Sequence, residues 1–333
     1  MGQSLQPGYD LIITNGDSAG EILRRAYAGT EVLPWRDVLH EGPVPLTDSH
    51  EELSRTRAGF LGGRNWEDRA ALLENFKARD RGLAHHETFE TVTLWFEHDL
   101  YDQLQLIQIL DWFAANPRSD GALWLVQAQD FLGTQTPESI TEFAKDRKPV
   151  SAAQLALART AWSAFRQPAP EAWAGLLNQD LSALPSLENA VRRMLQELPA
   201  PGSGLSRTQH QILMAINDGV ETPPLVFAAA GRLEEAAFMG DWSFWGWLDG
   251  LASNPGRLIE GLEGRFSPAL PEADIRAYLA STLRLNTLGL QVLAGAADYT
   301  KEAPIDRWAG GTHLTNDNLW RWDNETGKLA PPA

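Results

Sequence analysis

The sequence predicts an α/β protein whose N-terminal domain contains a mainly parallel, Rossmann-like sheet. Short apolar runs rich in β-branched and aromatic residues are predicted as strands at residues 11–14, 31–34, 91–96 and 122–126. Segments with apolar residues at helical spacing lie between them, at residues 19–28, 49–80 and 100–113. Alternating strands and helices indicate βαβ units, which build parallel sheets.

Three domains are predicted along the 333 residues. An α/β domain over residues 1–150 is followed by a helical connector over 151–200, which has no strand pattern. After a segment rich in proline and glycine, residues 205–333 form a winged-helix-like α+β module. This module is predicted from helices at 206–217, 234–239, 241–251 and 271–281, strands at 258–262 and 264–267, and a hairpin joining 319–322 to 328–329.

Composition narrows the class of protein. The chain has no cysteine, which excludes disulfides and thiolate metal sites. With 44 acidic and 28 basic residues its net charge is −16, so we expect no tight nucleic-acid binding. The first residues show no signal-peptide pattern and no window is apolar enough to span a membrane, which predicts a cytoplasmic protein without membrane contact. The sequence does not indicate an oligomeric state.

Polar residues follow each predicted strand, where open α/β sheets bind ligands. We predict that they line one site for a small molecule. The predicted catalytic residues are Asp17, Ser18, Asp37 and His98. The predicted ligand-binding residues are Asn15, Gly16, Trp35, Glu41, Glu97, Asp99 and Gln103. Clustered carboxylates favour a cation, so a divalent metal is the cofactor considered, with Asp17, Asp37 and His98 as its ligands.

Several of these residues have alternative interpretations. Asp17, Ser18 and Asp99 are residue types that cap helices, and Trp35 is a residue type that fills cores. The amides of residues 16–18 suit a phosphate, because they open a helix.

Gly-Asp-Ser at 16–18 is also similar to the opening block of the serine hydrolases named for that motif. In that reading Ser18 is the nucleophile, and Asp37 and His40 are its partners.

The N-terminal half resembles the uncharacterised bacterial group called domain of unknown function 1835. Three segments carry the resemblance: residues 14–18 (TNGDS), 33–43 (LPWRDVLHEGP) and 95–104 (WFEHDLYDQL). Residues 306–311 (DRWAGG) are similar to the end of longer members. The resemblance implies an intracellular bacterial protein and supports a three-segment site, but it carries no activity.

Two functions from different classes follow. The first is a small-molecule binding protein or hydrolase of nucleotide or phosphoester type, with its site at the carboxyl ends of the N-domain strands. The second is a non-enzymatic regulatory or adaptor protein that uses the winged-helix-like module. In that module Trp320, Arg321 and Trp322 alternate, which fits either a wing that touches nucleic acid or a half-buried hairpin.

Overall fold

The computed structural model describes residues 10–64, 66–119, 121–253 and 255–332. Residues 1–9, which carry part of the signal-peptide argument, lie outside this range. A five-stranded sheet has the order β2-β1-β3-β4-β5. Its strands are β1 (Asp10–Asn15), β2 (Glu31–Trp35), β3 (Thr91–Phe96), β4 (Leu123–Gln127) and β5 (Lys148–Pro149). Strands β1 to β4 are parallel and β5 is antiparallel to β4, so the predicted mainly parallel α/β sheet is confirmed.

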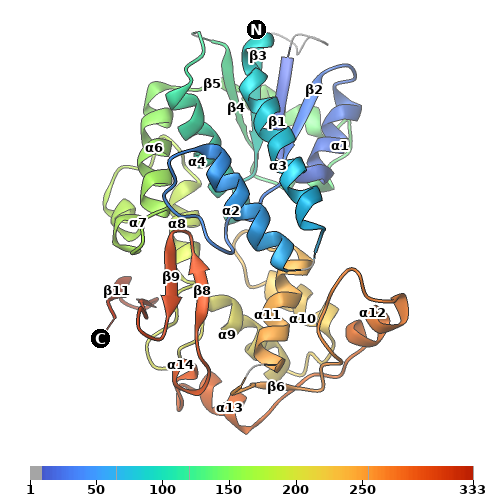
Figure 1. Ribbon diagram of the computed structural model, residues 1–333, viewed down its shortest axis with the longest axis vertical. Coiled ribbons are helices and arrows are strands. Elements are labelled where there is room, and N and C mark those ends of the chain that lie inside the picture. The colour runs from blue at the N-terminus through green and yellow to red at the C-terminus, as the bar shows by residue number, and fades with distance from the viewer. Residues whose placement is uncertain (1–9, 65, 120, 254, 333) are drawn as a thin grey trace.

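Both faces of the sheet are covered by helices. The helices of this half are α1 (Gly16–Ala26), α2 (His50–Gly63), α3 (Arg69–Ala84), α4 (Leu100–Ala115) and α5 (Ile140–Phe143). The chain reverses its direction across the sheet after β2, because β3 lies on the other side of β1. Right-handed crossovers then place α1 on one face and α3 and α4 on the opposite face (Figure 1).

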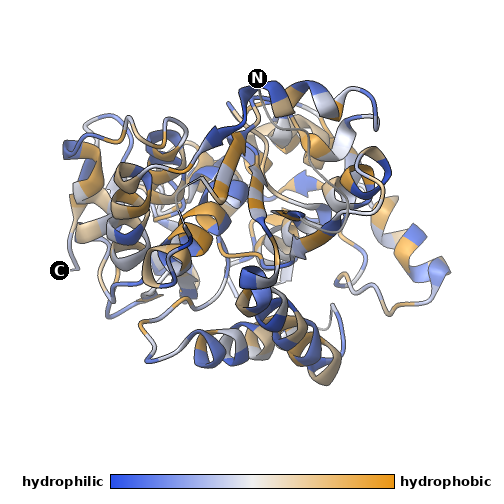
Figure 2. Ribbon diagram, turned by 90° about the horizontal axis from the view of Figure 1, so that it is seen from above, coloured by the Kyte–Doolittle hydropathy of each residue, from blue (hydrophilic) through white to orange (hydrophobic). Residues whose placement is uncertain are grey.

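The strands are apolar on both sides because both faces are buried. Leu11 and Ile13 of β1 belong to the core under α3 and α4, whereas Ile12 belongs to the core under α1. Hydrophobic residues accordingly fill the central strands in Figure 2. Strand β2 lies at the edge of the sheet, a position that suits Pro34 because proline donates no ladder hydrogen bond.

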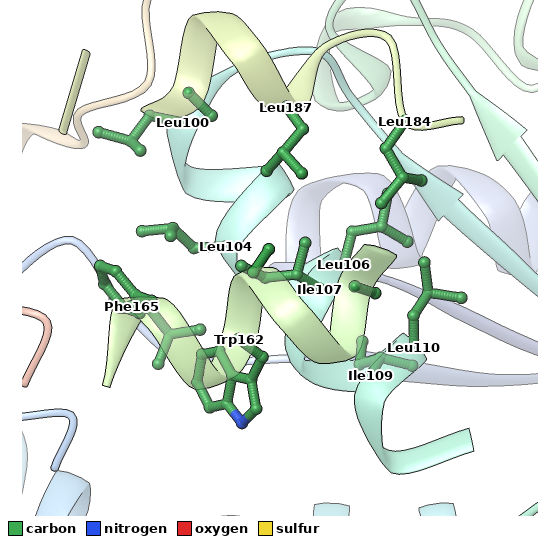
Figure 3. Close-up of a cluster of buried hydrophobic side chains, with 14 of the residues drawn as sticks. Leu100, Leu104, Leu106, Ile107, Ile109, Leu110, Trp162, Phe165, Leu184 and Leu187 are labelled. Carbon is green, nitrogen blue, oxygen red and sulfur yellow. The ribbon is translucent and has the colours of Figure 1, made fainter. Parts of the chain in front are cut away.

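The predicted helical connector packs against α4 and shares the core of the sheet. It contains α6 (Ala152–Phe165), α7 (Glu171–Gly175) and α8 (Leu187–Leu195). Trp162 and Phe165 of α6 and Leu187 of α8 point toward the leucines and isoleucines of α4 (Figure 3). Helix α6 begins where predicted, after Ser151, which forms a capping box with Gln154.

The C-terminal region contains helices and three short antiparallel strand pairs. Its helices are α9 (Arg207–Asn217), α10 (Pro223–Gly231), α11 (Asp241–Ser253), α12 (Glu272–Leu279), α13 (Thr287–Leu293) and α14 (Tyr299–Glu302). Its strands are β6 (Ile259–Glu260), β7 (Arg284–Leu285), β8 (Asp306–Ala309), β9 (Thr312–Thr315), β10 (Arg321–Asp323) and β11 (Lys328–Ala330). Short 3-10 turns are η1 (His85–Thr88), η2 (Leu132–Thr134), η3 (Ala144–Asp146) and η4 (Leu176–Asn178).

Most elements predicted here are confirmed, including the β10–β11 hairpin, but two are wrong. Residues 234–239 are not helical, because Glu234 and Glu235 are bound by Arg193 and Arg207 in an irregular segment. Residues 264–267 are not a strand; the Phe266 amide donates to a side-chain oxygen of Asp249 and not to a strand partner. No helix within the described residues is both long and apolar enough to cross a membrane.

Candidate ligand-binding site

A cavity of about 670 Å³ opens at the carboxyl ends of β1 and β2. We call it the strand-end cavity. It is lined by the first turn of α1, the loop after β2, residues of α2 and α3, Tyr101 of α4, and residues 238–243 before and at the start of α11. It adjoins the point where the chain turns from one side of β1 to the other, because β1 separates β2 from β3. Open α/β sheets bind ligands at such switch points.

The first turn of α1 contributes Gly16, Asp17 and Ser18 to this cavity. Helix α1 begins at Gly16, which has a φ of 56°, and Asn15 at the N-cap position makes no side-chain cap hydrogen bond. Neither Asp17 nor Ser18 is therefore the N-cap that their residue types suggested. The free amides at this end of α1 form the positive pole of the helix dipole, which attracts anions.

Asp17 is held by an arginine at the mouth of the cavity. Arg36 donates from Nε and Nη2 to the two oxygens of Asp17, at 2.7 and 2.6 Å. The hydrogen bond from Arg36 lowers the pKa of Asp17, so the carboxylate is ionised at neutral pH. Because both side chains are half or more exposed, the pair contributes little to stability. Its effect on the site is to offset the negative charge that Asp17 would present to an anion.

Asp37 is a buried structural anchor. Arg57 of α2 donates from Nε to Asp37 Oδ1 at 2.9 Å, and both side chains are fully buried. The same guanidinium donates to the carbonyl oxygens of Val38, Glu41 and Pro43. It therefore fixes the whole loop after β2. Asp37 Oδ2 has no hydrogen-bond partner among the described residues, and Asp37 lines the strand-end cavity.

Arg79 of α3 presents a buried cation to the cavity. Its Nη1 has no hydrogen-bond partner in the described chain and lies 3.9 Å from Asp37 Oδ2. Its Nη2 donates to Ser54 and Asp80, and its guanidinium lies over the Trp35 ring, 4.2 Å from the ring centre. Sequence reasoning missed Arg79. A signal existed, because it occupies the same helical stripe as Leu72, Phe76 and Leu83, where an arginine is unusual.

Aromatic side chains form the remaining wall. They are Trp66, Phe76, Tyr101, Phe238 and Trp242. The rings of Trp66 and Trp242 are 6.0 Å apart and tilted by 59°. Trp242 was expected to be a core residue, but it is half-buried and lines the cavity, because α11 folds against the strand ends.

His40 lies deep in the loop after β2. It is 6% exposed, and neither ring nitrogen has a hydrogen-bond partner among the described residues. Burial lowers its pKa to about 3, so the imidazole is neutral at pH 7. The serine-hydrolase arrangement is therefore not formed. Among the described residues His40 donates no hydrogen bond to Asp37, which is bound by Arg57, and no hydrogen bond joins the exposed Ser18 to a base.

A separate cluster of three buried carboxyls lies beside the strand-end cavity. Ligand atoms of Glu97, Asp99 and Asp102 all lie within 4.8 Å of one another. Asn15 joins them, because its Nδ2 donates to Glu97 Oε1 at 3.0 Å and to Asp102 Oδ2 at 2.6 Å. We call these four residues the carboxyl cluster. It links the end of β1 to the start of α4, where Asp99 is the N-cap, as the alternative interpretation predicted.

The carboxyl cluster retains protons at neutral pH. Burial raises the pKa of Asp99 to about 8, and the neighbouring Glu97 adds to this. Burial also raises the pKa of Glu97 and of Asp102. Main-chain amides occupy several oxygens, since Glu97 and Leu132 amides donate to Asp102 Oδ1 and Glu97 Oε1. The cluster is thus a hydrogen-bonded joint in which Asp99 retains a proton at neutral pH.

The predicted site residues therefore separate into groups. Gly16, Asp17, Ser18 and Asp37 meet at the strand-end cavity, whereas Asn15, Glu97 and Asp99 belong to the carboxyl cluster.

Three other predicted residues have different surroundings. Gln103 is fully buried and donates to the Glu97 carbonyl. Trp35 is fully buried and donates to Gln108, so it is a core residue and not a stacking platform. Glu41 faces a second cavity and pairs with Arg64.

The predicted metal ligands Asp17, Asp37 and His98 are not brought together. Within the described residues the group that could hold an ion is the carboxyl cluster. Asp17 and Asp37 are each paired with an arginine, and His98 packs against Phe131 with ring centres 5.7 Å apart. Adjacent residues point in different directions, so His98 does not follow Glu97 and Asp99 into their cluster.

The tryptophans of the C-terminal hairpin are structural. Trp320 and Trp322 are 7% and 4% exposed and belong to the core that α4 and α6 also form. Arg321 donates to Asp298 Oδ2 at 2.7 Å and to the Ala200 carbonyl. The half-buried-hairpin interpretation fits this geometry, because neither ring is available to stack on a base.

Comparison with known proteins identifies no relative. No protein-family model matches the chain, and no curated protein matches it. The function must therefore be argued from the geometry of the site.

Proposed function

We propose that this protein binds a small molecule of nucleotide or phosphoester type in the strand-end cavity. The observation that carries the proposal is that one cavity contains both the anion-attracting N-terminus of α1 and a wall of aromatic side chains. Its volume of about 670 Å³ is within the range of small-molecule sites.

The anionic part of such a ligand would lie at the start of α1. The amides of Gly16–Ser18 open the helix without a side-chain cap, and a helix N-terminus favours negative charge. Arg36 and Arg79 line the same cavity, and Arg79 Nη1, which lies 3.9 Å from Asp37 Oδ2, has no hydrogen-bond acceptor in the described chain. A phosphate here would supply the acceptor that this buried nitrogen lacks.

The planar part would lie against the aromatic wall. Trp66 and Trp242 approach from opposite halves of the chain, so a ring lying against this pair could contact both. Aromatic stacking on a nucleobase is largely independent of the base, because every base has a π face. The geometry therefore supports a ligand class and not one nucleotide.

Binding is better supported than hydrolysis. A general base works best when its pKa is near the operating pH. His40 has a pKa of about 3, and the buried Asp37 is occupied by Arg57. Hydrolysis would require a base that neither group supplies in this arrangement, so we place the hydrolase activity second to binding.

Two further points belong to this proposal. We propose that the chain belongs to the bacterial group called domain of unknown function 1835, on the resemblance of residues 14–18, 33–43 and 95–104, which lie at the ends of β1, β2 and β3. The alternative of a regulatory protein with a winged-helix-like module is less favoured, because the hairpin tryptophans are buried and Arg321 is paired.

Calorimetric titration of the whole chain with AMP, ADP, ATP and a simple phosphomonoester tests the proposal. Arg36→Gln and Trp242→Ala should each weaken binding by about tenfold, which corresponds to about 1.4 kcal/mol. Arg55→Gln is the matched control, since Arg55 is an exposed arginine on α2 outside the cavity lining.

The proposal fails if none of these ligands binds at millimolar concentration. It also fails if Arg36→Gln and Trp242→Ala bind as well as the control. Release of inorganic phosphate in the same samples would favour the hydrolase function over binding alone.

A further inference from the structure

A second cavity, of about 510 Å³, lies on the other side of His40. We call it the hinge cavity. It is lined by the loop at residues 40–42, the end of α2, the residue after α8 and segments around α11 and residues 299–308. His40 lines both cavities, so they are neighbours separated by one side chain. Among the residues predicted from the sequence, Glu41 lines it, and so does His40, the histidine of the serine-hydrolase interpretation.

Two buried carboxylates with unpaired oxygens line the hinge cavity. Glu41 and Glu197 are 6% and 4% exposed, and Glu41 Oε1 and Glu197 Oε2 have no hydrogen-bond donor among the described residues. Their other oxygens are occupied, by Arg64 for Glu41 and by Arg193 and Thr208 for Glu197. Burial opposes ionisation of Glu197, but Arg193 and Arg307 outweigh it and lower its pKa. Glu41 Oε1 lies 3.7 Å from His40 Nε2, and neither this oxygen nor Glu197 Oε2 receives a hydrogen bond from the described residues.

A cation without an ion-pair partner lies at the same cavity. Arg307 of β8 donates to the main-chain oxygen of Glu197 and lies over the Trp247 ring, 5.1 Å from its centre. In the described part of the chain it forms no ion pair with a carboxylate. Burial lowers its pKa to about 10, so it remains charged at pH 7.

The two kinds of unused group define the ligand. A simple anion would be attracted by Arg307 but repelled by the carboxylate oxygens, and a simple cation would be attracted by the carboxylates but repelled by Arg307. A molecule with both charges satisfies both. An ammonium offers three donors, and a carboxylate suits the guanidinium fork.

We propose that the hinge cavity binds a free α-amino acid as a zwitterion. Its ammonium group would lie at Glu41 and Glu197, and its carboxylate at Arg307. Phe60, Tyr299 and Trp308 also line the cavity and give its side chain an apolar surface. A divalent metal is a poorer occupant, because among the described residues the group spaced to hold an ion is the carboxyl cluster and not this set.

The test is a titration of the whole chain with the proteinogenic L-amino acids, by calorimetry and by shift in melting temperature. For the tightest binder, the amine that lacks the carboxylate and the acid that lacks the ammonium are titrated in parallel. We expect each analogue to bind at least tenfold more weakly than the amino acid. Equal binding of either analogue would refute the zwitterion, and so would the absence of any binding at 10 mM.

Variants connect binding to the cavity. Glu41→Gln keeps the shape and should weaken binding at least tenfold. Arg307→Gln should abolish it, and Arg307→Lys should restore part of it because the charge returns. Arg55→Gln, on the exposed face of α2, should bind as the native chain does.

Folding is checked by circular dichroism. If Arg307→Gln does not fold, Glu41→Gln and the two analogues decide the question. Unchanged binding in folded Glu41→Gln would overturn the proposal. Nucleotide binding is measured in the same samples, so failure at the hinge cavity is distinguishable from failure at the strand-end cavity.

Discussion

Replacing Asp99 by asparagine is expected to stabilise the fold at neutral pH and to have little effect at pH 4. Burial raises the pKa of Asp99 to about 8 in the folded chain. In the unfolded chain the pKa of an aspartate is about 3.9. Between these values the folded state holds a proton that the unfolded state has released. Stability therefore falls as the pH rises through this window and levels off above about pH 8.

The magnitude follows from the distance between the pH and the unfolded pKa. At pH 7 the unfolded carboxyl is about three units above its pKa, and each unit is worth about 1.4 kcal/mol, so ionisation favours unfolding by about 4 kcal/mol at most. Asparagine is neutral at every pH and removes this penalty. Its oxygen can accept the Asp102 amide hydrogen that Asp99 Oδ1 now accepts at 3.0 Å, so the cap of α4 is retained.

Urea unfolding followed by tryptophan fluorescence measures the effect, at pH 4, 5, 6, 7 and 8. We expect Asp99→Asn to match the native chain at pH 4 and to exceed its free energy of unfolding by about 2–4 kcal/mol at pH 7. Asp146→Asn is the control, because Asp146 is exposed. Parallel pH curves for Asp99→Asn and the native chain would refute the shared-proton account of the carboxyl cluster. A less stable variant at pH 8 would refute it equally.

Three other outcomes are expected. Arg57→Met should lower the free energy of unfolding by about 3–5 kcal/mol in urea titrations, because Asp37 would remain buried without its cation. Since His40 stays neutral in the fold to about pH 3, its own contribution to stability should fall as the pH drops below about 6.5, which is opposite in sign to the contribution of Asp99. His40→Leu should remove about 2 kcal/mol of the loss between pH 7 and 5, and unchanged pH curves would contradict the buried-histidine argument. A mobility-shift titration of the whole chain at about 0.15 M salt should show no micromolar duplex binding, because phosphate contacts need a surplus of lysine and arginine.

Local patterns were sufficient for the sheet and most of its helices. Runs such as Leu11–Thr14 and Thr91–Phe96 are too apolar and β-branched for anything except buried strands, and Ser151 and Ser206 mark helix starts through their own hydroxyls. The strand-end position of the site also followed from the sequence, since it needs the alternation of strands and helices and no side-chain coordinates. Helix α10 was missed, and the 234–239 helix was wrong, because ion pairs with Arg193 and Arg207 outweigh local propensity there.

Only the tertiary structure determined which polar residues lie close together and which partners they have. Asp17 and Asp37 were both predicted from the sequence as catalytic residues and metal ligands. In the structure, Arg36 pairs with Asp17 at the surface, and Arg57 pairs with Asp37 in the core. These partners lie 19 and 20 residues away, and no local pattern specifies such pairs. Arg79, Trp242 and Arg307 joined cavities because helices and a hairpin distant in sequence pack across the strand ends. The sequence by itself determined where a site would form, and only the packing of the two halves determined which charges line it and which are already neutralised.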